Sequence, residues 1–443
     1  MIKIFCPNNF EPERKYIIDT LLGDFLGLEY EIFNHEDLSY KIVLENDKIL
    51  TFNDSFWSKF DESKGYLSAD NIPHEVQFTK NQFTPENDIP VIFGDEQLTI
   101  SETKIDCGID IFSSSFFMLS RWEENVIQEK DIHQRFPCNL SLAQKHNFHY
   151  RPIVNEYLEM LWNMLQYMGC TQKRKQHIFE IIPTHDIDYF RQFNSFGAGF
   201  KHIAGDLLKR KSLKMAFDTT KKLTNVFFKK QKDAYDSFDF FMDFSEKYGL
   251  KSHFYFIAGQ KGETDVDYNF LQKKVKSTLD KIQKRGHVVG IHGGYDSYNN
   301  PEQFQKEIDR FKESGIEVKK GRQHYLRFQI PETWQMWDNL GMKYDSTIGY
   351  TNDSGFRAGI CHEYPVFDVK SRKKLDLIEL PLIFMETASQ KKYPKKEDFL
   401  NNLTELKNTV KRYNGQFVFL WHNSNVNSYL WRNYIDIYPE IFR

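Results

Sequence analysis

The sequence predicts an α/β protein, in which a barrel of the (β/α)7 type follows a smaller α+β domain. From residue 178 onward, apolar runs of strand length alternate with segments of helical periodicity. This alternation is typical of parallel strands joined by right-handed crossovers, and about seven such strands suit a barrel. An open doubly wound sheet is the alternative, although no Gly-rich phosphate loop follows a strand.

Residues 1–140 are predicted to form the α+β accessory domain. The expected elements are a strand at 2–5, a helix at 11–26, a hairpin of strands 40–44 and 48–52, a strand at 90–94 and an amphipathic helix with an aromatic face at 109–125. The pattern here contains no catalytic constellation, so a structural or docking role is expected. Residues 141–177 are predicted to be a helical linker.

Residues 178–443 hold the predicted barrel. The expected strands are 178–182, 253–258, 288–291, 321–328, 343–345, 375–380 and 417–421. The expected helices are 238–248, 270–285, 301–314, 331–340 and 396–413. Chemistry in such a fold gathers where the strands end, so the polar residues at those points are the candidates for a site.

Composition narrows the classes of partner and compartment. A net charge of −3, with 27% charged residues, argues against a nucleic-acid partner. The five cysteines are scattered without a CxxC pair, which argues against a disulfide framework or a thiolate zinc site. No stretch approaches the roughly 20 apolar residues of a membrane span, and the first residues turn polar too soon for a secretory signal. A cytoplasmic protein is expected.

The site is expected around Asp186-Ile187-Asp188, which follows the apolar run 178–182. Two carboxylates with one residue between them share a face of an extended strand. At the carboxyl end of a strand, next to His185, such a pair suits metal binding or general-base chemistry. For these residues alone, an Asx-rich turn that caps the strand is the alternative.

His292 follows the predicted strand 288–291 and is a candidate metal ligand. Asp296 lies four residues further on, and it reaches the same ion if the segment makes a helical turn. A turn histidine followed by an Asx motif is the alternative.

Three further strand ends carry candidates. Arg322 lies in the predicted strand 321–328, and an arginine that faces a barrel interior needs a carboxylate partner. Asp345 ends the next strand. His422 follows the very apolar run 417–421, where a satisfied core histidine is the alternative to a site residue.

In this order, the motifs resemble those of the NodB-homology polysaccharide deacetylases, carbohydrate esterases that remove acetyl groups from N-acetylated sugars. The resemblance covers roughly residues 178–425 and rests on Thr184-His185-Asp186-Ile187-Asp188, His292, Arg322-Gln323-His324-Tyr325, Asp345 and Leu420-Trp421-His422. It implies a distorted (β/α)7 barrel, an N-acetylated carbohydrate as substrate and a bound divalent metal ion. Zinc is the first expectation for that ion, with Mn, Mg, Co or Ni as alternatives.

The resemblance also implies catalytic roles. Asp186 would be the base, held by Arg322, while Asp188 and His292 would be metal ligands. His422, oriented by Asp345, would protonate the leaving amine.

Three aromatic side chains are expected to contact the sugar, namely Tyr325, Trp421 and Tyr295. The segment 115–124 resembles part of an uncharacterised domain that is fused ahead of such barrels.

Three positions depart from the family's pattern. His324 stands where the third motif has Pro, and Ile348 stands where the fourth has an aromatic residue. The serious departure is the family's second metal histidine, which falls at position 296, where this chain has Asp. A carboxylate is an acceptable ligand, so Asp296 is predicted to complete the site with Asp188 and His292 and to favour a harder ion. A related hydrolase on another C–N bond and a non-catalytic carbohydrate-binding barrel with a degenerate metal site are the alternatives.

Overall fold

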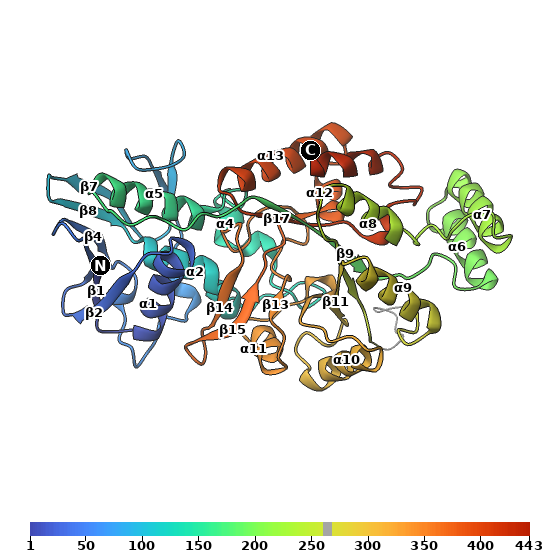
Figure 1. Ribbon diagram of the computed structural model, residues 1–443, viewed down its shortest axis with the longest axis horizontal. Helices are drawn as coiled ribbons and strands as arrows, with labels where there is room; N and C mark the ends of the chain where they lie inside the picture. Colours follow the sequence, from blue (N-terminus) through green and yellow to red (C-terminus); the bar gives the residue numbers. More distant parts are fainter. Residues whose placement is uncertain (260–267) are drawn as a thin grey trace.

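The computed structural model describes residues 1–259 and 268–443. The molecule is elongated, with a first sheet at one end, a second sheet in the middle and a pair of helices at the other end (Figure 1). Buried apolar side chains from both sheets and their covering helices join into one large hydrophobic core. The two halves therefore share one continuous core at their junction.

The first sheet has six strands in the order β2-β1-β3-β4-β8-β7. These strands are β1 (Ile2–Pro7), β2 (Tyr30–His35), β3 (Ser39–Val43), β4 (Ile49–Asn53), β7 (Gly94–Ile100) and β8 (Lys104–Ile109). A separate ladder joins β5 (Gln77–Thr79) to β6 (Ile89–Val91). The predicted hairpin is confirmed, because β3 and β4 pair antiparallel with Tyr40 opposite Phe52.

Two helical segments of the first half differ from the prediction. The predicted helix 11–26 consists of α1 (Glu11–Ile18) and a π-helix (Asp19–Phe25) that continues it. The segment 109–125 is helical as predicted, but it is not one amphipathic helix. It forms α2 (Ile111–Ser120) and α3 (Trp122–Val126), separated by Arg121 at φ 53°.

Every residue of α2 is buried. The helix contacts α1, α5 (Ile153–Tyr167) and β14 (Tyr364–Asp368), so both halves of the molecule cover it. A helix that is covered on all sides needs no solvated polar face, and the hydroxyls of Ser113 and Ser120 donate inside the fold, to Asp110 and to the carbonyl of Phe116. The apolar run in α2 is thus explained by its place at the junction of the two halves.

A buried cluster of charges lies at the same junction. Arg121 donates to Glu123 at 2.6 Å and to Glu124 at 2.9 Å. From the second half, the Nε of Arg357 donates to the same Oε1 of Glu124 at 2.9 Å. All four side chains are almost wholly buried. Two cations and two anions balance one another, which offsets the cost of removing them from water.

We expect Arg357→Ala to lower the free energy of unfolding by about 3–5 kcal/mol, because it leaves the buried Glu124 without one of its two cationic partners. Urea unfolding followed by circular dichroism measures the loss. Arg443→Ala is the matched control, since Arg443 is exposed and its pair with Glu440 should contribute less than about 1 kcal/mol. Equal losses in the two variants would contradict the prediction.

The second sheet has nine strands in the order β14-β15-β13-β12-β11-β10-β9-β17-β16. Besides β14, they are β9 (Glu180–Ile187), β10 (His253–Phe256), β11 (Val288–Gly293), β12 (Lys320–Gln323), β13 (Tyr344–Asp345), β15 (Lys373–Glu379), β16 (Phe384–Met385) and β17 (Gln416–Leu420). Every ladder is parallel except that between β14 and β15. The strand ends that carry the candidate residues therefore share one edge.

This sheet is curled. After β15, the amide of Leu382 donates to the carbonyl of Ile348 at 2.9 Å, and the next amide, of Ile383, donates to the carbonyl of Val418 at 3.0 Å. One short segment thus joins strands from opposite parts of the sheet. The edge strands β14 and β16 share no ladder within the described residues, so a closed barrel stays a prediction.

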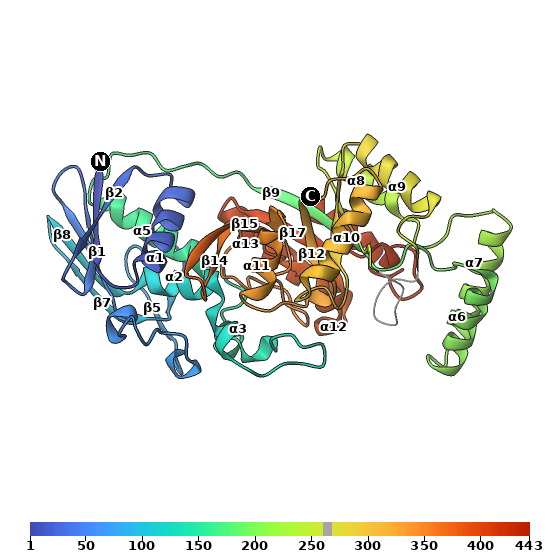
Figure 2. The same ribbon diagram turned by 90° about the horizontal axis from the view of Figure 1, so that it is seen from below.

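Helices of the second half cover this sheet (Figures 1 and 2). They are α8 (Phe238–Lys247), α9 (Lys273–Lys284), α10 (Pro301–Glu313), α11 (Glu332–Asn339), α12 (Glu386–Lys392) and α13 (Lys396–Arg412). The short helix α4 (Leu142–Lys145) precedes α5 in the connection between the sheets. In residues 1–259 and 268–443, none of the helices has the length and apolar character needed to cross a bilayer.

The sequence predicts no element between residues 189 and 237, yet the chain forms a helical hairpin there. Helices α6 (Phe196–Leu208) and α7 (Leu213–Phe227) pack side by side and stand apart from the rest of the molecule (Figure 2). The hairpin follows β9, the strand that carries the two candidate carboxylates.

Candidate metal centre

Strand β9 presents both candidate carboxylates to one side of the sheet. It extends to Ile187, five residues beyond the predicted end, so Asp186 lies within the strand and Asp188 directly after it. Side chains alternate along a strand, which turns His185 to the opposite face. There the ring of His185 stacks on Phe241 at 3.7 Å, and burial lowers its pKa to about 3. His185 is a neutral core residue.

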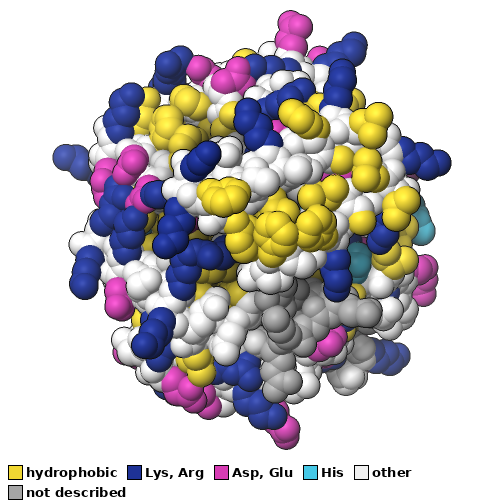
Figure 3. All heavy atoms as spheres, turned by 90° about the vertical axis from the view of Figure 1, so that its right-hand side faces the viewer, with side chains coloured by type: hydrophobic (Ala, Val, Ile, Leu, Met, Phe, Trp, Pro, Cys, Tyr) yellow, Lys and Arg dark blue, Asp and Glu magenta, His cyan; other side chains and the backbone are white. Residues whose placement is uncertain are grey.

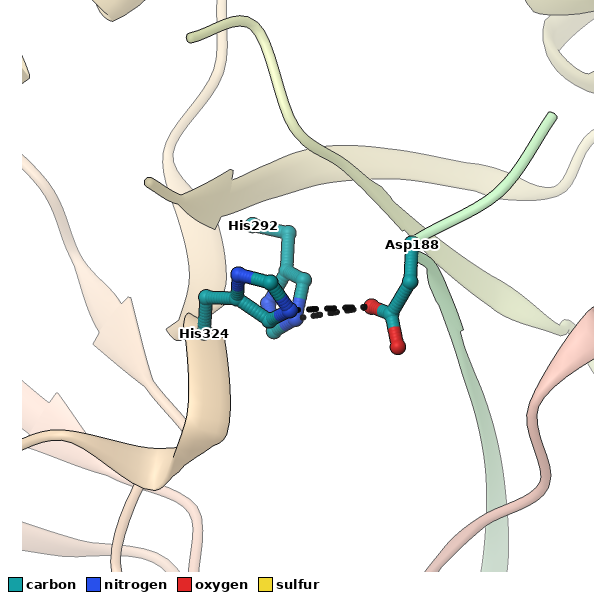
Figure 4. A group of neighbouring side chains, drawn as sticks. All are labelled: Asp188, His292 and His324. Atoms are coloured by element: carbon teal, nitrogen blue, oxygen red, sulfur yellow. Dashed lines mark ion pairs between the residues drawn. The ribbon is translucent and has the colours of Figure 1, made fainter. Parts of the chain in front are cut away.

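Asp188, His292 and His324 form a cluster that could hold a metal ion, with one ligand atom from each within 4.8 Å of the others. Figure 4 shows both imidazoles facing the carboxylate. Oδ1 of Asp188 lies 3.4 Å from Nε2 of His292 and 3.7 Å from Nε2 of His324. His292 belongs to β11, and His324 opens the 3-10 turn after β12. Strands β9, β11 and β12 thus contribute to one cluster, although β10 lies between β9 and β11 in the sheet.

The geometry and the donor types fit a metal ion. A tetrahedral zinc ion with bonds of about 2.1 Å places its ligand atoms about 3.4 Å apart. Oδ1 of Asp188 is buried and has no hydrogen-bond partner among the described residues, although it faces two imidazoles. Nδ1 of His292 donates to the carbonyl of Arg322 at 2.8 Å, which leaves Nε2 to act as the ligand.

Without an ion, the cluster attracts protons to its imidazoles. Burial raises the pKa of Asp188, but the close imidazole of His292 and the charges of His324 and His422 outweigh it, so that pKa lies below its usual range. Burial lowers the pKa of His292, but the charges of Asp186 and Asp188 outweigh it, so that pKa is raised. A divalent ion competes with these protons, so the affinity of the cluster for the ion should decrease as the pH is lowered.

Arg322 fixes the second carboxylate, Asp186. Its Nη1 donates to Oδ1 of Asp186 at 2.9 Å and to Oγ1 of Thr184 at 3.0 Å. Its Nε and Nη2 donate to the carbonyl and the hydroxyl of Ser346. Oδ2 of Asp186 is left facing Nε2 of His292 at 3.7 Å. The guanidinium is fully buried and held on two sides, so it sets the position of the carboxylate.

His422 approaches the cluster from β17, with Nε2 at 3.7 Å from Oδ2 of Asp188. Its Nδ1 lies 2.7 Å from Oε1 of Glu386, the first residue of α12. Burial lowers the pKa of His422, but the charges of Glu386, Asp188 and Asp186 outweigh it and raise the pKa to about 10. The imidazole is therefore held in its protonated form while no ion is bound.

The expectation that Asp345 orients His422 is not met, because Glu386 takes that place. Asp345 lies on β13 opposite Glu379 of β15, and its Oδ1 accepts from the amide and the hydroxyl of Thr347. Burial raises the pKa of Asp345 to about 7. Burial and the charge of Asp345 likewise raise the pKa of Glu379. These two acids form a buried pair behind Arg322.

This pair predicts a pH dependence of stability. Between about 3.9, the pKa of an unfolded Asp, and about 7 in the folded protein, the folded state binds more protons, so the free energy of unfolding falls as pH rises. Asp345→Asn keeps the acceptor for Thr347 and cannot ionise. Between about pH 5 and about pH 8, we expect the free energy of unfolding measured with urea to decrease by about 1–3 kcal/mol less in this variant than in the wild type. An unchanged slope would contradict the assignment.

The structure also corrects the prediction for Asp296. Its side chain is 81% exposed and pairs with Arg327 at 3.1 Å, away from Asp188 and His292. After β11 the chain makes a tight turn, in which the amide of Ser297 donates to the carbonyl of Gly294, and not the helical turn that would bring position 296 back. His324 occupies the third position of the cluster instead.

A pocket of about 370 Å³ opens over the cluster. Its lining residues are Arg135, Asp186, Asp188, His292, His324, Tyr325, Leu326, Thr351, Met385, Thr387, Leu420, His422, Ser424 and Asn425. The ring of Tyr325 is 42% exposed and lies in the wall, as expected for a side chain that contacts a ligand. Arg135 comes from the first half, and its Nη1 donates to the carbonyl of Tyr325 at 2.7 Å.

The other two aromatic expectations are not met. Trp421 is fully buried and packs on Trp431 and Tyr438, because strand alternation turns its neighbour Leu420 to the pocket. Tyr295 lies outside the pocket lining, with its ring at 3.9 Å from the guanidinium of Arg327.

Three residues of the site were not assigned from the sequence. His324 stands where the related motif has Pro, and that substitution was the available signal. Glu386 follows the short apolar run 382–385, another strand end with an acid behind it. For Arg135 the sequence offers no signal, since the contact depends on how the two halves pack.

Comparison with family models gives a match over the first part of the chain. Residues 2–169 match the model of a family of unknown function, DUF7033. This match ends between the predicted domain limit at 140 and the first strand of the second sheet. No curated protein matches the chain.

Several solved structures are distantly similar. One is described as a putative polysaccharide deacetylase from Mycobacterium smegmatis, with 11% identity, a TM-score of 0.39, and coverage of 60% of this chain and 85% of that one. A 4-alpha-glucanotransferase from Thermococcus litoralis has 12% identity and a TM-score of 0.35, over 60% of this chain and 37% of that one. The chitin deacetylase of the fungal pathogen Colletotrichum lindemuthianum has 9% identity and a TM-score of 0.28, over 60% and 85%.

Proposed function

We propose that the protein is a metal-dependent hydrolase that removes N-acetyl groups from a sugar or a polysaccharide precursor. One observation carries the proposal: a metal-binding cluster, a carboxylate fixed by an arginine and a histidine fixed by a carboxylate meet in a single pocket. The cluster is Asp188, His292 and His324. Asp186, held by Arg322, and His422, held by Glu386, line the same pocket, while Arg322 and Glu386 lie behind them. Metal-dependent hydrolysis of an amide uses a Lewis acid, a base and an acid in such an arrangement.

A divalent ion held by Asp188, His292 and His324 would lower the pKa of a water molecule and polarise the acetamide carbonyl. Asp186 would accept a proton, a role supported by Arg322, which holds Oδ1 and leaves Oδ2 facing the cluster. His422, whose Nε2 lies 3.7 Å from Oδ2 of Asp188, would donate a proton to the leaving amine. Base and acid thus flank the cluster from β9 and β17.

The donor set favours zinc over magnesium. Two imidazoles and one carboxylate are typical of zinc and of other late first-row ions, whereas magnesium prefers oxygen ligands. The harder ion expected from a carboxylate at position 296 is no longer favoured, because Asp296 lies outside the cluster. We therefore propose Zn as the native ion, with Co, Ni and Mn as possible replacements.

The test is acetate release from a panel of N-acetylated mono- and oligosaccharides, using the full chain after chelation and after reloading with single metals. We expect release from at least one sugar with zinc and none with the chelated protein. If the protein binds zinc and sugars but releases no acetate from any of them, the non-catalytic carbohydrate-binding alternative replaces the proposal.

We expect Glu386→Gln to lower kcat by about 10- to 100-fold, since the variant loses the charge that holds His422 protonated and oriented. The alkaline limb of the pH–rate profile should also move to lower pH, which a purely structural defect would not cause. Asp345→Asn is the matched control, because the sequence predicted Asp345 for this role. A larger loss in Asp345→Asn than in Glu386→Gln would contradict the assignment.

A further inference from the structure

The helical hairpin α6–α7 stands at one end of the molecule, away from the pocket (Figures 1 and 2). Its helices pack closely, because a Cβ at Gly199 would lie only 2.2 Å from Cδ1 of Leu223. Leu223 is buried between them, together with Ala216 and Thr219 of α7. The hairpin thus has a small interior of its own, which leaves its outer surface to be explained.

That outer surface is unusually apolar. Figure 3 shows apolar side chains gathered on this end of the molecule, with lysines and arginines around them. The large apolar residues of the hairpin that are 42–80% exposed are Phe196, Phe200, Leu207, Leu208, Leu213, Phe217, Phe227 and Phe228. Phe196 contacts the rings of Phe200 and Phe227 at 5.0 and 4.9 Å, so part of the set is one continuous patch. Contiguous exposed apolar patches mark interaction sites.

The hairpin also concentrates positive charge. Residues 196–230 contain nine Lys or Arg and two Asp, a formal charge of +7 in a chain whose total is −3, which leaves −10 on the rest. Asp206 pairs with Arg210 and Asp218 with Lys222. Within the described part of the chain, the other seven cations of the hairpin have no ion-pair partner. Because the hairpin is positive and the rest of the chain is negative, a negatively charged surface attracts the hairpin end of the molecule.

We propose that the α6–α7 hairpin docks the protein onto an anionic membrane surface. Exposed Phe and Leu beside a basic face is the pattern of helices that lie in the bilayer interface, where the rings enter the headgroup region and the lysines contact anionic lipid. The charge complementarity favours a lipid surface over a second copy of this chain, because two hairpins of +7 would repel each other. The proposal does not depend on the catalytic activity, since no residue of the hairpin lines the pocket.

The test is co-sedimentation of the full chain with large vesicles of phosphatidylcholine alone, or with about 30 mol % phosphatidylserine, at about 0.1 M salt. We expect binding to the anionic vesicles only, and loss of that binding at about 1 M salt. Replacing three exposed lysines, Lys209→Gln, Lys211→Gln and Lys214→Gln, should weaken binding by about 100-fold, at about fivefold for each. Lys273→Gln, Lys274→Gln and Lys276→Gln on α9 form the matched control and should have little effect.

A second pair of variants tests the apolar patch. Phe200→Ser with Phe217→Ser should weaken vesicle binding by at least about tenfold, while Leu38→Ser with Ile178→Ser, exposed apolar residues elsewhere, should not. Thermal unfolding shows that each variant is folded. Equal binding to neutral vesicles, or binding that the hairpin variants leave intact, would overturn the proposal. A dimer that Phe200→Ser with Phe217→Ser dissociates, without vesicle binding, would also overturn it and assign the patch to a second copy.

Discussion

Asp186→Asn is expected to lower kcat by about 100- to 10,000-fold, the usual range for the loss of a general base. The amide has nearly the shape of the carboxylate and keeps an oxygen that can accept from Arg322, but it cannot take a proton. Arg322 is held independently by Thr184 and Ser346, so its position should survive the change. Acetate release under saturating substrate measures the loss.

Metal content is the control for this variant. Asp186 is not a member of the cluster of Asp188, His292 and His324, so the zinc bound per protein should match that of the wild type. Activity within about tenfold of the wild type would contradict the role of Asp186 as the base. A loss of zinc together with activity would instead make Asp186 a metal ligand.

His324→Ala is expected to weaken zinc binding by more than about 100-fold, because even changes to residues behind the ligands commonly cost 10- to 100-fold. Zinc affinity can be measured by competition with a chromophoric chelator, without any substrate. The cluster would retain only Asp188 and His292, too few protein ligands for a typical zinc site.

Asp296→Asn is the matched control, since the sequence predicted Asp296 as the third ligand and the structure places it on Arg327. We expect its zinc affinity to equal that of the wild type. If Asp296→Asn loses zinc and His324→Ala does not, the chain rearranges on binding the ion and the predicted ligand set is restored.

Much of the candidate site could be predicted because its members follow apolar strand runs. Asp186, Asp188, His292 and His422 come from strands whose ends meet at one edge of a parallel sheet, so a one-dimensional pattern was enough to group them. Arg322 was predicted to need a carboxylate, and its partner is Asp186.

The missed residues depend on the geometry of turns, which a periodic pattern does not contain. After β12 the chain enters a 3-10 turn in which Tyr325 has φ 60°, and this turn presents His324 to the cluster. After β11 a different turn points Asp296 to solvent. Glu386 depends on how α12 follows the two-residue strand β16. The sequence shows which residues occupy these positions, but it does not show where their side chains point.

The hairpin was missed for another reason. Its outer face is apolar and its interior is small, so apolar residues occur on both sides of α6 and no single amphipathic stripe stands out. In the sequence, its basic runs, Lys209-Arg210-Lys211 and Lys229-Lys230, look like ordinary solvated surface. Only their gathering at one end of the molecule, beside exposed phenylalanines, distinguishes them.

Both halves of the chain contribute to the pocket, because Arg135 of the first half contacts Tyr325 of the second. Nη1 of Arg135 donates to the carbonyl of Tyr325, and Nε of Arg327 donates back to the carbonyl of His133. The floor of the pocket, with its acids and imidazoles, belongs to the second half, whereas part of the rim belongs to the first. If the proposed function holds, exchanging the first half would alter which substrate enters the pocket, while the proposed reacting groups would stay as they are.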